Sequence, residues 1–495
     1  MASNFDFVRA GWPEIAVEAR KAEGYANGDP RSSLFYSRRA IELVVNWLYE
    51  VDAALRRPYK NDLAALTYEP TFKNLVGPGL VAKLSLIRKQ GNDAVHRADV
   101  PRPADSVSMV RELFHVLVWV ATHYARTPEE RPIAGVSFDV SLLPQPRSGA
   151  AAQSMMQVQK LAAELASRDS DLEEARQQNA SLEVELAQLR AEVALAKQAN
   201  ATLVDTHDYR EDETRSLFID LLLKEAGWAL TDARDIEFPV TGMPNNSEGG
   251  KGFVDYVLWG EDGMPLGLVE AKRTRKEANI GQQQARLYAD ALERQFGQRP
   301  VIFYSNGYDH WIWDDSEYPP RQVQGLYTRD QLALLIQRRT TRKTLASLTV
   351  SESIAGRHYQ QRAVRKVAEA FENKERRALL VMATGSGKTR TVIALSDLLI
   401  RANWAKRILF LADRVALVNQ ATNAFKAQLP DAAPVNLVTE KDVDGRVYLS
   451  TYPTMMGLID SGADDLRRFG PGYFDLIVVD EAHRSVYQKY GAIFD

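Results

Sequence analysis

The sequence predicts a multidomain chain with an all-α first part and an α/β second part. Apolar residues recur at helical spacing up to about residue 145, and an unbroken heptad pattern follows from about residue 151 to 204. From about residue 206, short apolar runs alternate with amphipathic helices, which is the pattern of α/β domains. At 495 residues the chain is too long for one domain, and three or four are expected.

Composition excludes several classes of protein. The chain has no cysteine, so it can form neither disulfides nor thiolate metal sites, and this favours the cytoplasm. No apolar run is long enough to span a membrane, and the first residues lack the basic segment of a signal peptide. Because the net charge is only −3, any contact with nucleic acid must come from local patches.

The first part is expected to be a helical domain. Residues 33–50 and 111–123 each place apolar side chains on one helical face. Residues 84–96 resemble the small HEPN-like helical domains at the front of many bacterial defence proteins, some of which cleave RNA with an Arg and a His. Arg88 and His96 would be the candidates, but their spacing is longer than the catalytic pattern of that group. We therefore expect a structural domain here.

The heptad pattern predicts one long helix that spans roughly 70 Å. Asn179 and Asn200 share a heptad position, where a buried Asn fixes register in coiled coils. Two arrangements are open: a coiled coil with a second copy or a partner, and a single amphipathic helix that lies on its own protein. The heptad positions are Val158, Leu161, Leu165, Arg168, Leu172, Ala175, Asn179, Leu182, Leu186, Leu189, Val193, Ala196, Asn200 and Leu203.

A β-hairpin is predicted around Asp262-Gly263, because this dipeptide separates the apolar runs 252–259 and 266–272. Counting outward from a two-residue turn pairs Trp259 with Leu266 and Asp255 with Glu270. The two carboxylates then lie opposite each other, and strand alternation puts Lys272 on the same face.

Two facing carboxylates repel each other unless a positive charge lies between them, so the hairpin predicts a divalent cation. Hard oxygen ligands favour Mg²⁺, bound by Asp255 and Glu270. Glu213, on a helix expected to end at Gly227, could complete the site. A surface strand with a simple salt bridge is the alternative. Measuring Mn²⁺ binding by an Asp255→Ala variant separates the two.

A short basic run suited to phosphates follows the hairpin, and then a helix with a Gln and a Tyr on one face. Arg273 and Arg275 lie in a short basic run, and Gln284 and Tyr288 lie four residues apart on one helical face. The surroundings are acidic, since residues 205–330 hold 14 Lys plus Arg against 23 Asp plus Glu. Generic affinity for DNA should therefore be poor, and any DNA must be brought here by something else.

A phosphate-binding loop is predicted at Val381–Thr389. It follows an apolar run, 378–382, expected to be a buried parallel strand, and precedes an amphipathic helix. Its glycines let backbone N–H groups surround a phosphate at a helix N-terminus. Lys388 would meet the β- and γ-phosphates, and Thr389 would bind Mg²⁺. The usual pattern has a further glycine, where this chain has Met382. The ATP-binding residues expected in the loop are Thr384, Gly385, Ser386, Gly387, Lys388 and Thr389.

A second element supports the loop. Residues 473–483 contain an apolar run that is expected to be a strand and is followed by Asp480 and Glu481. The two carboxylates would lie at the C-terminal edge of an α/β sheet, where ligands bind. Asp480 would hold Mg²⁺, and Glu481 would orient or deprotonate the attacking water.

Together, Ala-Thr-Gly-Ser-Gly-Lys-Thr and Asp-Glu-Ala-His resemble the first RecA-like lobe of superfamily 2 helicases and DNA translocases. The resemblance makes Gln360 the reader of adenine. It places residues 410–420 on the nucleic-acid path and residues 450–452 at a DNA-contacting motif. The second motor lobe does not appear, so we expect a truncated motor with negligible ATPase activity.

Asp, then Glu-x-Lys across a hairpin, resembles the nuclease core of many restriction enzymes. The order of helical domain, coiled coil, nuclease core, Gln-x-x-x-Tyr helix and motor resembles the restriction subunit of Type I restriction-modification enzymes. The resemblance implies ATP-driven translocation and Mg²⁺-dependent cleavage of unmethylated DNA, with modification and specificity subunits as partners. S-adenosylmethionine would be used only by the methyltransferase partners.

The expected domains are a helical domain, a linker, a coiled coil, a restriction-endonuclease-like α/β nuclease core, a second linker and an incomplete motor lobe. They cover residues 1–127, 128–150, 151–204, 205–335, 336–355 and 356–495. Two other functions stay open: a single-chain helicase-nuclease of DNA repair or another defence system, and an assembly module without catalysis.

Overall fold

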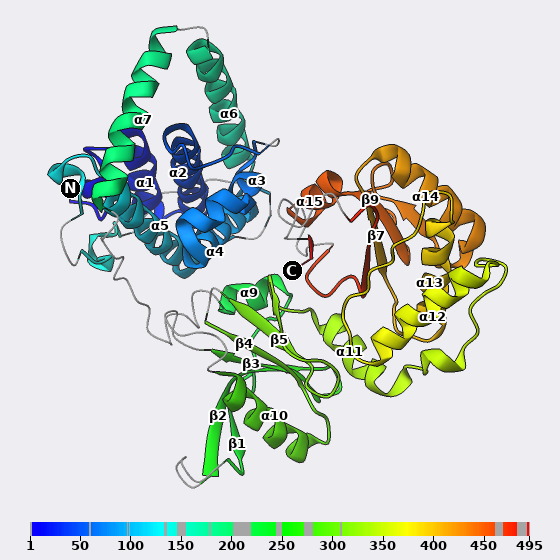
Figure 1. The fold of residues 1–495 in the computed structure, drawn as a ribbon. Coiled ribbons are helices and arrows are strands. Elements are labelled where there is room, and N and C mark those ends of the chain that lie inside the picture. Colours follow the sequence, from blue (N-terminus) through cyan, green and yellow to red (C-terminus); the bar gives the residue numbers. More distant parts are fainter. Residues whose placement is uncertain are drawn as a thin grey trace. The chain divides into compact units, whose positions relative to one another are not determined.

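The computed structural model describes residues 2–58, 61–96, 98, 100–132, 136–145, 155–177, 180–200, 219–243, 250–271, 281–306, 309–460, 469–482 and 493–494. The chain divides into two units, one over residues 1–208 and the other over most of residues 209–495 (Figure 1). The first unit is helical and the second is α/β, as the sequence predicts. No helix among the described residues is long and apolar enough to cross a membrane.

The helical unit is built around α2 (Pro30–Val51), which contacts α1 (Pro13–Tyr25), α4 (Pro70–His96) and α5 (Pro103–Tyr124). The short α3 (Leu63–Tyr68) packs against α4. Asp29 begins α2, because its side chain accepts a hydrogen bond from the Ser32 N–H at 3.2 Å and Pro30 fixes the first turn. A kink divides α4 at Gly77, whose φ is +79°, followed by Pro78.

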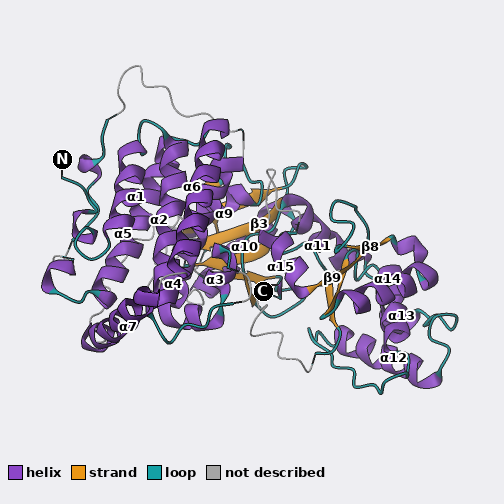
Figure 2. Cartoon of the chain, turned by 90° about the horizontal axis from the view of Figure 1, so that it is seen from above, coloured by secondary structure: helices purple, strands orange, loops and turns teal. Residues whose placement is uncertain are grey.

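The heptad segment forms two helices, α6 (Met155–Gln177) and α7 (Ala180–Asn200), so the prediction of one 70 Å helix is wrong. Both helices return to the same helical unit (Figures 1 and 2). Gln159 donates to the carbonyl of Val95 at 2.9 Å, and Asn200 donates to the carbonyl of Ala125 at 3.0 Å. Of the described heptad positions, Val158, Val193 and Asn200 are buried, and α2, α4 and α5 are the helices that contact α6 and α7. Asn179 lies outside the described residues.

The second unit contains two sheets, and the first is a mixed sheet with the order β1-β2-β3-β4-β5-β6. Only β3 and β4 run parallel, joined by the crossover helix α10 (Gln282–Phe296). One face packs against α10, and the other packs against α9 (Asp220–Glu225) and α11 (Arg329–Thr341). This part, residues 219–341, is called the mixed-sheet module. Its strands are β1 (Ile236–Thr241), β2 (Lys251–Trp259), β3 (Pro265–Ala271), β4 (Val301–Ser305), β5 (His310–Trp313) and β6 (Arg321–Val323).

The second sheet is parallel, with the order β10-β7-β9-β8. This part, residues 343–494, is called the parallel-sheet module. Helices α12 (His358–Glu372), α13 (Lys388–Arg401) and α14 (Val415–Gln428) share one apolar core with its strands. The opposite face packs against α15 (Tyr452–Asp460). Its strands are β7 (Ile408–Ala412), β8 (Pro434–Asn436), β9 (Val447–Thr451) and β10 (Leu476–Val479).

The strand predicted before the phosphate loop is not formed. Residues 378–382 have no strand structure, and Leu379 and Val381 are 78% and 88% exposed. The four strands pair without this run, so the expectation of a buried parallel strand is wrong. An apolar run shows only that a segment is able to enter a sheet, because pairing also requires a neighbouring strand that accepts from its N–H groups and donates to its C=O groups.

An ion pair joins the two modules of the second unit. Arg338 of α11 is 2% exposed and makes two hydrogen bonds to Asp475, which directly precedes β10. Asp475 also accepts the N–H groups of Lys406 and Arg407, at 2.7 and 2.9 Å. Helix α11 therefore continues past residue 335, where the nuclease core was expected to end and a linker to begin, and its last turn is joined to the residue that precedes β10.

Candidate active sites

The first candidate site lies on the hairpin of β2 and β3. The two strands pair Tyr256 with Val269, Val257 with Leu268 and Leu258 with Gly267. The next step along both strands brings Asp255 opposite Glu270, as predicted. Alternation puts Glu270 on the face of Leu268, which packs under α10.

Two irregularities lie between this pair and the turn. The Gly263 N–H donates to the Gly260 carbonyl at 3.0 Å and the Gly260 N–H donates to the Met264 carbonyl at 2.8 Å, so the loop has three residues. Gly263 has a φ of +76°, which favours glycine. Trp259 consequently pairs with Pro265, and the predicted pairing with Leu266 is wrong. A bulge between Leu258 and Trp259 then restores the predicted register.

The two carboxylates lie in different surroundings. Glu270 is only 2% exposed, in a strand that is buried along its whole length. Asp255 is half-buried, and its Oδ2 accepts a hydrogen bond from the N–H of Ala271 at 2.7 Å. That bond ties the Asp255 side chain to the residue next to Glu270 and so fixes its direction.

The Gln-x-x-x-Tyr pair packs on this hairpin. Gln284 Nε2 donates to the Tyr288 hydroxyl at 2.9 Å, as expected from their spacing on α10. Tyr288 is buried, and its ring lies so close to Gly252 of β2 that a Cβ there would be 2.9 Å from a ring carbon. A glycine is therefore needed at residue 252. The contact places Gln284 and Tyr288 beside the strand that carries Asp255.

Several predicted residues cannot be placed. Glu213, Lys272, Arg273 and Arg275 lie outside the described residues. Within the described ranges, no group of three or more His, Asp or Glu side chains could hold a metal ion. Of the residues predicted to carry out cleavage, the structure describes only the predicted metal pair, Asp255 and Glu270.

A buried Ser–His contact lies beside the hairpin and was not predicted. Ser305 pairs with Ala271 across the parallel strands β3 and β4. Its Oγ lies 2.7 Å from Nδ1 of His310, and both side chains are buried. The sequence feature that could have pointed to Ser305 is its place at the end of an apolar run, since this run forms the strand parallel to the one that carries Glu270.

The second candidate site is the phosphate loop. Gly385 and Gly387 have φ values of +75° and +88°, so both adopt the left-handed conformation expected of the loop glycines. Helix α13 begins at Lys388, directly after Gly387. Thr389 is half-buried in the first turn of this helix, and Thr384 is exposed in the loop.

The residues predicted to bind nucleotide do meet at this loop. Lys388 Nζ lies 3.0 Å from Oε1 of Glu481, and the two side chains are 37% and 34% exposed. Asp480 and Glu481 directly follow β10, and the Glu481 N–H donates to Oδ1 of Asp480 at 3.1 Å. Burial and the neighbouring Glu481 carboxylate raise the pKa of Asp480 above its ordinary value.

Gln360 also contacts the loop, and its side chain bonds to the loop backbone. Gln360 is 3% exposed, and its Nε2 donates to the carbonyl of Ser386 at 3.0 Å. Tyr359 donates its hydroxyl to the same carbonyl at 2.8 Å, and this tyrosine was not predicted. The predicted DNA-contacting residues Ser450, Thr451 and Tyr452 are all buried.

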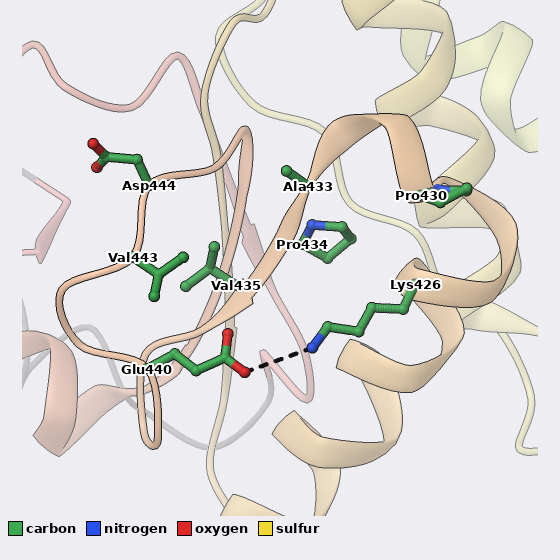
Figure 3. Close-up of a pocket in the computed structure, with 8 residues that line it drawn as sticks. All are labelled: Lys426, Pro430, Ala433, Pro434, Val435, Glu440, Val443 and Asp444. Atoms are coloured by element: carbon green, nitrogen blue, oxygen red, sulfur yellow. Dashed lines mark ion pairs between the residues drawn. The ribbon is translucent and has the colours of Figure 1, made fainter.

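A pocket of about 290 Å³ lies at the β8 edge of the parallel sheet, opposite the β10 edge that carries Asp480. Apolar side chains, among them Val435 and Val443, line it together with Lys426 and Glu440 (Figure 3). Lys426 and Glu440 form an ion pair at 3.6 Å. None of the predicted nucleotide-binding residues lines this pocket.

Comparison with known proteins gives two family matches, and two of the curated relatives are subunits of Type I restriction enzymes. Residues 353–495 match the family described as Type III restriction enzyme, res subunit, and residues 20–133 match a domain of unknown function, DUF4145. The Type I restriction enzyme EcoAI endonuclease subunit of Escherichia coli is 34% identical over 248 residues, 47% of this chain and 29% of that protein. The EcoKI endonuclease subunit of Escherichia coli strain K12 is 26% identical over 348 residues, 57% of this chain and 29% of that protein.

Among solved structures, a fragment described as an HsdR subunit of a type I restriction enzyme from Vibrio vulnificus YJ016 is 24% identical. The match covers 58% of this chain and 54% of the fragment, with a TM-score of 0.24, which is too low to support an argument on fold. The chain spans 29% of the length of each curated relative. Over the matched residues, the chain is thus related to the HsdR-type endonuclease subunits of Type I restriction enzymes.

Proposed function

We propose that the chain is the N-terminal part of a Type I restriction endonuclease subunit that cleaves unmethylated DNA with Mg²⁺ and translocates DNA with ATP. The observation that carries this proposal is the pairing of Asp255 and Glu270 on one face of the hairpin. The mixed-sheet module would be a restriction-endonuclease-like nuclease core, and the parallel-sheet module the first RecA-like motor lobe.

The donor set of the hairpin fits Mg²⁺, because Asp255 and Glu270 supply hard carboxylate oxygens in neighbouring strands. A bound Mg²⁺ would supply activated water and stabilise negative charge on the scissile phosphate. The chain itself supplies orientation, since the Ala271 N–H holds Oδ2 of Asp255 at 2.7 Å. Lys272 follows Ala271 in the sequence and would add a positive charge near the scissile phosphate.

Gln284 and Tyr288 would help position the DNA beside the nuclease centre. Tyr288 is buried against Gly252 and its hydroxyl accepts from Gln284 at 2.9 Å, so the side-chain amide of Gln284 is held in one orientation. Arg273 and Arg275 would contact phosphates. The acidic composition of residues 205–330 supports a nuclease that depends on the motor and the partner subunits for its DNA.

In the motor lobe, Lys388 would move from Glu481 to the β- and γ-phosphates of ATP. Thr389 and Asp480 would hold the Mg²⁺ of the nucleotide, and Glu481 would orient the attacking water. Gln360 would read adenine. The similarity of residues 353–495 to a restriction-enzyme subunit supports this assignment.

The partners proposed are double-stranded DNA and the modification and specificity subunits, which would recognise the target sequence and use S-adenosylmethionine. The chain spans 29% of the length of these two curated relatives. The test is therefore made with the complete gene product, together with a candidate pair of methyltransferase and specificity subunits.

The assay is cleavage of unmethylated, covalently closed plasmid with Mg²⁺, with and without ATP. We expect cleavage to require ATP and the methyltransferase subunits, and to be lost in Glu270→Gln and in Lys272→Ala. Glu369→Gln, at an exposed ion pair of α12, serves as a control and should cut normally. Cleavage without the methyltransferase would instead identify a single-chain helicase-nuclease, and unchanged cleavage by Glu270→Gln would disprove the nuclease site.

A further inference from the structure

Two side chains of α12 donate hydrogen bonds to one carbonyl of the phosphate loop. The Tyr359 hydroxyl lies 2.8 Å and Gln360 Nε2 lies 3.0 Å from the carbonyl oxygen of Ser386. Tyr359 and Gln360 are consecutive residues in the first turn of the helix. The loop is therefore attached to α12 at a single peptide group.

Arg357 fixes the direction of both donors. Its Nη1 donates to the Tyr359 hydroxyl oxygen at 2.7 Å, which leaves the hydroxyl hydrogen for Ser386. Its backbone N–H donates to Oε1 of Gln360 at 3.3 Å, which turns Nε2 toward the loop. The network runs from Arg357 through the two side chains to the Ser386 carbonyl.

Holding the Ser386 carbonyl also sets the direction of the Gly387 N–H. All peptide bonds described are trans, and in a trans peptide the C=O and the following N–H point in opposite directions. Because the carbonyl points toward α12, the Gly387 N–H points away from it. Gly387 must be glycine, since its φ is +88° and a Cβ would lie 2.3 Å from Nε2 of Gln360.

We propose that the Tyr359 hydroxyl is a positioning group that orients the Ser386–Gly387 peptide so that the Gly387 N–H is available to a nucleotide phosphate. This inference rests on the proposed nucleotide-binding function of the loop. Tyr359 acts through the backbone of the loop and does not touch the base. Its contribution is therefore the same for any ligand that carries the triphosphate.

The consequence distinguishes this role from base recognition. A side chain that reads or stacks on adenine changes the affinity for ATP and has little effect on a ligand without a base. A side chain that orients the phosphate loop changes the affinity for ATP, GTP and inorganic tripolyphosphate by the same factor.

The test compares the wild-type chain with Tyr359→Phe, which removes only the hydroxyl. Dissociation constants for ATP, GTP and tripolyphosphate, each with Mg²⁺, are measured by competition against a fluorescent ADP. Since one neutral hydrogen bond is lost, we expect all three to weaken by about three- to ten-fold. Thermal unfolding should be unchanged, because Tyr359 is 44% exposed.

Two further variants sharpen the result. Arg357→Gln should weaken all three ligands in the same direction, and the double variant should be no weaker than Tyr359→Phe, because Arg357 acts through the tyrosine hydroxyl. Additive losses would overturn the network from Arg357. A loss confined to ATP would overturn the inference and assign Tyr359 to the base, and no loss at all would also overturn it.

Failure of the proposed function gives a different pattern. If the wild-type chain binds none of the three ligands, the loop is not a nucleotide site, and both the proposed function and the inference are wrong. If the wild-type chain binds and Lys388→Ala does not, the proposed function stands and the comparison with Tyr359→Phe decides the inference alone.

Discussion

The Nζ atom of Lys388 lies 3.0 Å from Oε1 of Glu481, so the cation proposed to bind phosphates is paired with a carboxylate. In the proposed nucleotide site, ATP would displace this pair. Since both side chains are about one-third exposed, the pair is worth little, and Glu481→Gln should bind MgATP about two- to five-fold more tightly than wild type. Isothermal titration measures this. Weaker binding by Glu481→Gln would contradict the prediction, and Lys388→Ala, which should lose binding, is the control.

The raised pKa of Asp480 predicts that the stability of the fold depends on pH. Its pKa is raised in the folded chain by burial and by Glu481, so the folded state holds the proton more tightly than the unfolded state. The free energy of unfolding should therefore fall as pH rises from the ordinary Asp pKa through the raised value. Asp480→Asn should be more stable than wild type at neutral pH without Mg²⁺, and this difference should shrink in acid.

Thermal unfolding from pH 4 to 8, without Mg²⁺, checks this prediction. Asp397→Asn is a suitable control, because Asp397 lies on α13 and pairs with Arg401. Equal stability of wild type and Asp480→Asn at every pH would show that the raised pKa has no influence on folding.

Two substitutions at Asp255 should separate its role in metal binding from its role in stability. Asp255→Asn keeps an oxygen that can accept from the Ala271 N–H, whereas Asp255→Ala loses this 2.7 Å bond. Both variants should lose Mn²⁺ binding and DNA cleavage. Only Asp255→Ala should lose stability as well, by about 1 kcal/mol. Identical Mn²⁺ binding by wild type and Asp255→Ala, measured by titration calorimetry, would disprove the metal site.

The ion pair of Arg338 and Asp475 should be important for stability. Arg338 is 2% exposed, and removing one partner of a buried pair leaves the other charge uncompensated. Arg338→Met should therefore reduce the free energy of unfolding by about 3 kcal/mol in urea titrations. Lys366→Met, at an exposed pair, should change it by less than about 0.5 kcal/mol. Similar effects of both substitutions would contradict the structure.

Asn200 should stabilise the helical unit and should not determine the oligomeric state. It is 1% exposed, donates to the carbonyls of Ala125 and His123 at 3.0 and 3.3 Å, and accepts from Arg131. Asn200→Ala should cost about 1–3 kcal/mol, with the molar mass from light scattering unchanged. Gln188→Ala, at an exposed position of α7, is the matched control. A changed molar mass with normal stability would restore the coiled-coil role.

Much of both candidate sites could be predicted because it follows residue patterns of known geometry or chemistry. The pairing of Asp255 with Glu270 follows from strand alternation, and the placement of Lys388 and Glu481 at one site follows from a loop and a strand of known chemistry. Contacts without such a pattern were not predictable, whether their partners lie near or far along the chain. No sequence pattern indicates the hydrogen bond of Tyr359 to Ser386, and none indicates the contact of Ser305 with His310.

The errors have physical causes. The heptad pattern shows where an apolar face lies, but it cannot show whether another chain or the same chain packs on it, and here α2, α4 and α5 contact the two helices that carry it. The apolar run 378–382 has the composition of a strand, but pairing is decided by the neighbouring strand. Arg88 is buried and His96 is exposed on α4, and the structural role expected for that pair stays a prediction.

The bulge between Leu258 and Trp259 has a consequence for changes in chain length. The three-residue loop displaces the pairing by one position, and the bulge displaces it back before Asp255 is reached. Deleting one residue between Asp255 and the loop would remove this compensation and turn Asp255 to the opposite face from Glu270. Relatives that differ in length by a single residue at this hairpin should therefore carry a second, compensating change within it.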